Sequence, residues 1–378
     1  MRPIYLDHNA TTPLGPGVLD AMLPFLRDYF GNPSSNHALG RACQEAIEDA
    51  RGKIAALVGA DQDEIVFTSG GTESNNLALL GILLQDAPMP AGHLIVSAIE
   101  HPAVAEPAVH LQRLGYEVTV VPCGAEGRID PAAVQAALRP ETRLVSIMHA
   151  NNETGVIQPI AELAEICHDH EVLLHTDAAQ TVGKIPAFVD ELGVDLMTVA
   201  GHKMHAPKGV GALYLRRGVR LEPLLRGAAH EAGLRPGTEN VASIVGMGHA
   251  ACWALKNLED SRQAIARLRD RLETELSREM GGELRVLGRK APRLPNTSSV
   301  CFPDVVGAEL LARVPEICAS TGSACHSGSV GLSPTLRAMG VPPEQARGAV
   351  RLSLGWQNTP EDVERAVSLL LAAWEALR

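Results

Sequence analysis

Short apolar runs alternate with segments of helical periodicity along the first two-thirds of the chain. Runs of about five apolar residues predict strands, and apolar positions that recur every three or four residues predict helices. Because the strands alternate with helices and are apolar throughout, we expect an α/β fold with a mostly parallel, seven-stranded sheet between helices. The predicted strands are 64–68, 94–98, 117–121, 144–148, 172–176, 196–200 and a run beyond Gly211, and the predicted helices are 18–29, 38–57, 72–84, 102–114, 131–138 and 160–168.

The pattern changes after Gly227, where helical segments at 241–254 and 261–280 precede short strands that alternate with helices. Such a pattern is typical of a smaller α+β domain, and 378 residues exceed what one core normally covers. We therefore expect a large domain at 14–250 and a small domain built from 1–13 and 251–378. The predicted elements of the small domain are strands 297–302, 317–320 and 350–354 and helices 307–313 and 360–377.

Composition and charge narrow the possible partners. The net charge is −11 and no basic run occurs, which argues against a nucleic-acid partner or an anionic membrane surface. No apolar stretch reaches the roughly 18 residues of a membrane span, and we expect no signal peptide because the first residues lack an apolar core. The seven cysteines show no paired spacing, which favours a reducing, cytoplasmic compartment and no metal site.

Lys203 lies where a ligand site is expected. In a parallel sheet, ligands bind beyond the carboxyl ends of the strands, and Lys203 follows the predicted strand 196–200 on a turn bounded by Gly201 and Pro207. A lysine held by rigid elements and removed from water can form a Schiff base. A solvated loop lysine is the alternative on this stretch alone.

Other strand ends supply groups that match one cofactor. Any of them alone could be a core histidine, an Asx turn or a helix cap, but their convergence on one sheet edge favours a site for pyridoxal phosphate. Gly71 and Thr72 begin a helix and could hold the phosphate, as could His202. Asp177 could keep the ring nitrogen protonated. The other expected cofactor ligands are His101 on the ring face, Asn152 and Gln180 at the ring hydroxyl, and Lys203 as the Schiff base.

Two residues of the predicted small domain also point to chemistry. Cys325 lies in a loop of small residues that cannot pack a core, so its thiol could act as a nucleophile; an incidental loop cysteine is the alternative. Arg351 is a charge inside an apolar strand and requires an anion. A substrate carboxylate would serve, and an internal salt bridge is the alternative.

The chain resembles the cysteine desulfurases of the NifS/IscS type, which are fold-type I pyridoxal-phosphate enzymes of the class-V aminotransferase family. The resemblance runs nearly end to end. The matching motifs are Phe67-Thr68-Ser69-Gly70-Gly71-Thr72-Glu73-Ser74-Asn75-Asn76, Glu100-His101-Pro102-Ala103-Val104, Asn151-Asn152-Glu153-Thr154-Gly155, His175-Thr176-Asp177, Gly201-His202-Lys203, Gly237-Thr238-Glu239-Asn240 and Gly322-Ser323-Ala324-Cys325.

The resemblance implies a homodimer in which Thr238 reaches the cofactor phosphate of the partner subunit. It also implies that L-cysteine becomes L-alanine while its sulfur is left on Cys325 as a persulfide, for delivery to an acceptor protein such as an iron–sulfur scaffold. Lys203, Cys325 and His101 would be catalytic, and Asn152 and Arg351 would bind the substrate.

Some positions depart from that pattern. Many relatives have serine where this chain has Ala200, so one phosphate donor is missing, and several motifs are similar to those of selenocysteine lyases. A lyase acting on L-selenocysteine is therefore the alternative within the same chemistry. A non-catalytic scaffold, which would bind no cofactor, and an ordinary aminotransferase or decarboxylase, which would not use Cys325, are alternatives from other classes.

Overall fold

A seven-stranded sheet occupies the centre of the first two-thirds of the chain in the computed structural model, which describes residues 2–85, 92–321 and 332–378. The strands are β2 (Ile65–Thr68), β3 (His93–Ser97), β4 (Glu117–Val121), β5 (Thr142–Ser146), β6 (Leu173–Asp177), β7 (Leu196–Ala200) and β8 (Gly211–Leu215). Their order is β2-β8-β7-β6-β5-β3-β4, and of these seven strands β8 alone runs antiparallel to the other six. The predicted mostly parallel sheet is thus confirmed.

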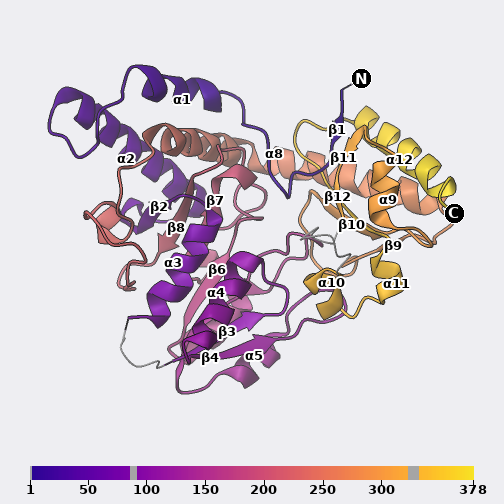
Figure 1. Ribbon diagram of the computed structural model, residues 1–378, viewed down its shortest axis with the longest axis horizontal. Coiled ribbons are helices and arrows are strands. Elements are labelled where there is room, and N and C mark those ends of the chain that lie inside the picture. Colours follow the sequence, from indigo (N-terminus) through magenta and orange to yellow (C-terminus); the bar gives the residue numbers. More distant parts are fainter. Residues whose placement is uncertain (1, 86–91, 322–331) are drawn as a thin grey trace.

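Helices cover both faces of this sheet (Figure 1). Successive side chains of a strand point to opposite faces, so Val66 packs in one hydrophobic cluster and Phe67 in the other. One face is covered by α3 (Gly71–Leu83) and α4 (Pro102–Arg113). The helices α1 (Val18–Arg27), α2 (Ala38–Val58), α5 (Pro131–Ala137), α6 (Ile160–Asp169) and α7 (Val189–Leu192) contribute to the other cluster.

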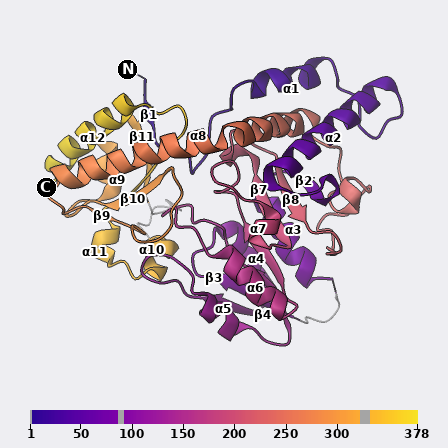
Figure 2. The ribbon, with the colours of Figure 1, turned by 180° about the vertical axis from the view of Figure 1, so that it is seen from behind.

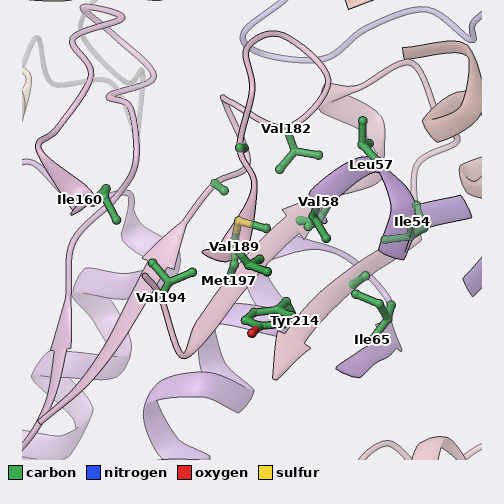
Figure 3. Close-up of a cluster of buried hydrophobic side chains, with 14 of the residues drawn as sticks. Ile54, Leu57, Val58, Ile65, Ile160, Val182, Val189, Val194, Met197 and Tyr214 are labelled. Atoms are coloured by element: carbon green, nitrogen blue, oxygen red, sulfur yellow. The ribbon is translucent and has the colours of Figure 1, made fainter. Parts of the chain in front are cut away.

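The larger hydrophobic cluster is almost entirely aliphatic, as the 3% aromatic content requires. Figure 3 shows Ile54 and Val58 of α2 lying near Ile65 of β2 and Tyr214 of β8. All four side chains are buried, and each aliphatic one contributes roughly 1.5–3 kcal/mol to folding. This packing holds the strands, and hence their carboxyl ends, in fixed positions.

One long helix, α8 (Val241–Glu279), replaces the two helices predicted at 241–254 and 261–280 (Figure 2). The predicted break between them is wrong. The buried residues of the first part of α8, up to Ala254, pack in the core of the large sheet, whereas Leu272 and Leu276 pack in a second core. Between the cores α8 has no apolar face to bury, but it contains no glycine or proline there, so the backbone stays helical. The predicted domain boundary at 250/251 falls inside this helix and stays a prediction.

The second core lies beside a four-stranded antiparallel sheet of order β12-β13-β10-β9 and a parallel pair, β1 with β11. The predicted strand 317–320 is divided, since its first half pairs with the N-terminal strand and its second half begins a strand of the other sheet. The bounds are β1 (Ile4–Tyr5), β9 (Arg285–Val286), β10 (Thr297–Cys301), β11 (Ile317–Cys318), β12 (Ser320–Thr321), β13 (Ala349–Ser353), α9 (Gly307–Ala312), α10 (Pro334–Ala338), α11 (Pro343–Ala346) and α12 (Pro360–Glu375). Among the helices described, none combines the length and the apolar character needed to cross a membrane.

Candidate active site

A cavity of about 330 Å³ opens at the carboxyl ends of β2, β3, β5, β6 and β7. The sequence predicted that polar residues after these strands would meet there, because parallel strands present their carboxyl ends at one edge. The predicted residues that line the cavity are Gly71, Thr72, His101, Asn152, Asp177, Gln180, His202 and Lys203.

Lys203 ends a short 3-10 turn, Gly201–Lys203, directly after β7. Its ammonium donates hydrogen bonds to the backbone carbonyls of Asn9 and Ala10, the latter at 2.9 Å. Burial, and then the positive charge of Arg351, lower the pKa of Lys203 from 10.5 to about 8, although Asp177 and Asp7 act in the opposite direction. The amine is therefore much closer to its neutral, nucleophilic form at physiological pH than an exposed lysine is.

Asp177 is the last residue of β6 and is only 6% exposed. One carboxylate oxygen accepts a hydrogen bond from the side-chain amide of Asn75 at 2.7 Å, and the other accepts one from the backbone N–H of Ala179 at 2.9 Å. Two donors in a buried position hold the carboxylate in one orientation. Asn75 lies on α3 and is a site residue that sequence reasoning did not assign, although the motif around Thr72 contains it.

Burial lowers the pKa of both histidines of the cavity. His101 caps α4 by accepting a hydrogen bond from the backbone N–H of Ala103 at 3.1 Å, and the pKa of His101 is lowered by burial and by Lys203. Burial, followed by the charges of Lys203 and Lys208, lowers the pKa of His202 to about 4. Both rings can therefore contact a ligand without adding positive charge beside Lys203.

The N-terminal end of α3 forms one wall of the cavity. The turn before it passes through Gly70, whose φ of 150° suits glycine. A Cβ atom on Gly71 would lie 3.2 Å from the Cβ of Ala200, which also lines the cavity. A second open cavity of about 430 Å³, which Lys208 helps to line, adjoins this end. Helix N–H groups, Thr72 and a nearby lysine suit a phosphate.

Arg351 does not line the cavity itself but lies next to it. The buried guanidinium donates to the backbone carbonyl of Asn152 at 3.1 Å and forms an ion pair with Asp7 at 2.8 Å. Its Nε atom is buried and has no hydrogen-bond partner among the described residues. The salt bridge considered as the alternative from sequence therefore exists, and it leaves one donor for a further anion.

The remaining predicted site residues lie elsewhere. Thr238 is exposed and lies outside the cavity of its own chain. Cys325 is outside the residues that the structure describes. Within the described ranges, no cluster of three or more histidine, cysteine or acidic side chains is arranged to hold a metal ion.

Two further groups beside the cavity had no sequence signal. The side chain of Asn9 accepts from Lys184 and donates to the backbone carbonyl of Asn152 at 3.1 Å. Lys184 also donates to Gln180 at 2.8 Å. Burial and the charge of Lys203 place the pKa of Lys184 well below its usual value. Neither residue follows a predicted strand, so the rule that located the other residues could not find them.

These groups fit pyridoxal phosphate. An amine of lowered pKa, an oriented carboxylate and a helix N-terminus surround one cavity large enough for a small planar ligand, and Gly71 places no side chain at that helix N-terminus. The fold and the site together define a fold-type I pyridoxal-phosphate enzyme.

Comparison with known proteins agrees. The family described as aminotransferase class-V matches residues 4–366, and the chain belongs to that family. It is 46% identical over 379 residues to a protein of Dictyoglomus turgidum named "Cysteine desulfurase IscS", covering 100% of this chain and 96% of the relative. A solved structure titled "NIFS-LIKE PROTEIN" matches with a TM-score of 0.91 and 37% identity, covering 100% of this chain and 99% of that one. A structure titled "SspA in complex with cysteine" matches with a TM-score of 0.83 and 36% identity, over 94% and 99% of the two chains.

The lowered pKa of Lys203 predicts how cofactor-free protein recombines with pyridoxal phosphate. If Lys203 forms the Schiff base, its neutral amine would attack the aldehyde, and since its pKa is about 8, the rate is expected to rise about tenfold per pH unit below pH 8 and to level off above it. Stopped-flow absorbance between pH 6 and pH 10 measures this rate. A rise that continued toward pH 10.5 would show an ordinary lysine.

Proposed function

We propose that this chain is a cysteine desulfurase, which converts L-cysteine to L-alanine and transfers the sulfur to Cys325. The proposal is carried by the convergence of eight predicted residues on one cavity, in a chain whose full-length relative is named a cysteine desulfurase. The comparisons give no support to the selenocysteine lyase alternative.

Five residues of the cavity have proposed parts in this reaction. Pyridoxal phosphate, when bound, supplies an aldehyde that captures an amino group and a ring that withdraws electrons from the substrate Cα. Lys203 would hold the aldehyde between turnovers and would move the Cα proton with its Nζ atom. Asp177 would keep the ring nitrogen protonated, His101 would contact the ring, and Gln180 and Asn152 would bind the ring hydroxyl.

The substrate carboxylate is assigned to Arg351. The buried, unpartnered Nε of Arg351 can donate to the substrate carboxylate, because Asn152 and Asp7 already engage its two Nη atoms. Asn152 is held next to this position because its backbone carbonyl accepts hydrogen bonds from the side chains of Arg351 and Asn9. Binding the carboxylate here places the substrate Cα between Arg351 and Lys203.

The sulfur step uses the thiolate of Cys325. The thiolate attacks the substrate sulfur, so that a sulfur–sulfur bond forms as the bond from substrate Cβ to sulfur breaks. Cβ then takes up a proton, which gives L-alanine and a persulfide on Cys325. An acceptor protein, such as an iron–sulfur scaffold, receives this sulfur.

Product analysis tests the proposal. Incubation with L-cysteine and a thiol reductant is expected to yield alanine and sulfide in equal amounts. An ordinary aminotransferase or decarboxylase of this fold would release no sulfide, and a non-catalytic scaffold would also be colourless and take no label from borohydride.

Asp177→Asn is expected to lower cysteine turnover about 10- to 100-fold, because a hydrogen bond to a charged group is worth roughly 1.5–3 kcal/mol. Steady-state alanine formation measures the effect. Asp195→Asn is the matched control, since Asp195 is equally buried but contacts Leu174 and Arg216 away from the cavity. Equal losses in both variants would indicate general destabilisation.

We further propose a homodimer. Thr238 is exposed and does not line the cavity of its own chain, so we assign its role at a cofactor phosphate to a second copy. The helix α1 buries only Val18 and leaves an apolar outer face. The large apolar side chains exposed on and just after α1 are Leu19, Leu23, Leu26, Tyr29 and Phe30. A contiguous apolar face of this kind is typical of a subunit interface.

Leu26→Glu is expected to raise the dimer dissociation constant at least about tenfold, because an unpaired carboxylate would be buried at the interface. Sedimentation velocity over a concentration series measures it. Leu114→Glu changes an exposed leucine at the end of α4 and should leave the dimer intact. A wild-type protein that sediments as a monomer would contradict the proposal.

A cytoplasmic location completes the proposal. The six cysteines of the described residues are all free thiols, which suits a reducing compartment.

A further inference from the structure

The segment that carries Thr238, residues 229–240 between β8 and α8, has an unusual backbone for its sequence. Glu231 and Ala232 both lie in the left-handed region, with φ of 46° and 54°. Each such non-glycine residue costs about 1 kcal/mol or more. The 229–240 loop also contributes no residue to the hydrophobic clusters apart from Leu234 at the edge of one. Polar contacts must therefore hold this conformation.

The first contact is a two-point ion pair between the 229–240 loop and α2. Arg51 donates to both carboxylate oxygens of Glu231, at 2.7 and 2.8 Å, and Glu231 also accepts from the backbone N–H of Phe67 at 2.7 Å. Arg51 donates in addition to the backbone carbonyl of Ile65 at 2.8 Å. Since β2 is an edge strand, this ion pair satisfies backbone groups that a neighbouring strand would otherwise use.

The second contact joins the middle of the loop to Glu73, in the first turn of α3. Arg235 forms an ion pair with Glu73 at 3.0 Å, and the other carboxylate oxygen of Glu73 accepts from the backbone N–H of Ser69 at 2.8 Å. Both contacts therefore end on the strand and turn that form the expected phosphate site of the same chain. The loop is fixed to its own chain, while Thr238, three residues after Arg235, stays exposed.

We propose that the Arg51–Glu231 ion pair is a positioning device that acts across the subunit interface: it holds the 229–240 loop so that Thr238 of one chain contacts the cofactor phosphate of its partner. The side chain of Glu231 is only 3% exposed and that of Arg51 11%, so the pair is geometrically defined rather than a loose surface contact. This inference rests on the proposed dimeric pyridoxal-phosphate enzyme and adds two residues that touch neither cofactor nor substrate.

Hybrid dimers test the direction of this effect. One chain carries Lys203→Ala, so that only the other chain can retain the cofactor covalently, and differently tagged chains allow the hybrid to be purified. Glu231→Gln is placed either on the chain with intact Lys203 or on the chain with Lys203→Ala. Cofactor loss to an excess of a scavenging apoenzyme is timed in both hybrids and in the hybrid without Glu231→Gln.

Cofactor loss is expected to be about tenfold faster when Glu231→Gln is on the chain opposite the intact Lys203, and clearly less affected when it is on the same chain. Equal rates in the two arrangements, or an effect only on the same chain, would overturn the inference. Arg235→Gln, at a side chain that is 24% exposed, provides a second variant with the same expected asymmetry if Glu231→Gln does not fold.

The outcomes separate the inference from the function on which it rests. If borohydride traps no cofactor on Lys203 of the wild-type chain, the proposed function fails. If it does, and Thr238→Val on the opposite chain accelerates cofactor loss but Glu231→Gln and Arg235→Gln do not, only the positioning role is wrong.

Discussion

Lys203→Ala is expected to abolish covalent retention of pyridoxal phosphate and to lower alanine formation from cysteine about a thousandfold or more. Lys203 is proposed both to hold the aldehyde and to move the Cα proton, and proton transfer by a positioned side chain alone contributes roughly 10²–10⁴-fold. Its amine lies in the cavity with a pKa of about 8. Borohydride reduction followed by mass spectrometry of the tryptic peptide measures the retention.

Lys184→Met is the informative control, because the structure places a second lysine of lowered pKa beside the cavity. The Lys184 side chain does not line the cavity and is already held by Gln180 and Asn9. This variant should still show the borohydride label on Lys203. A label that survives Lys203→Ala and disappears with Lys184→Met would reverse the assignment.

Cys325→Ser is expected to lower alanine formation from cysteine at least about a thousandfold while leaving cofactor binding intact, since a hydroxyl does not replace a thiolate as a nucleophile toward sulfur. Parallel turnover of L-cysteine and L-selenocysteine by the wild type and this variant measures the effect. Release of selenium needs no persulfide, so selenocysteine turnover should be less affected.

Cys252→Ser serves as the matched control, because Cys252 is an exposed thiol on α8 to which no role is assigned. It should retain wild-type turnover of both substrates. If Cys325→Ser forms alanine from cysteine at the wild-type rate, the desulfurase proposal fails, and a preference of the wild type for selenocysteine would favour the lyase.

Local periodicity predicted most of the fold but missed the continuity of α8. The segment between its two buried parts lacks an apolar face because it lies between two cores, and periodicity reports burial rather than the backbone conformation itself. The division of the predicted strand 317–320 was also missed, because local periodicity does not report which partner strand a residue pairs with. Which sheet each half joins depends on β1 and β13, which lie far away in the sequence.

For the site, the sequence by itself determined that Lys203, Asp177 and His101 follow apolar strands, and the geometry of a parallel sheet then brings them to one edge. Only the tertiary structure decided which groups the site residues contact. Asn75 donates a hydrogen bond to Asp177, Asp7 forms an ion pair with Arg351, and the backbone carbonyl of Asn9 accepts a hydrogen bond from Lys203. The tertiary structure likewise joined Glu231 to Arg51. Hydrogen bonds and ion pairs form between groups that packing of the whole chain brings together, and such pairs leave no periodic trace in the sequence.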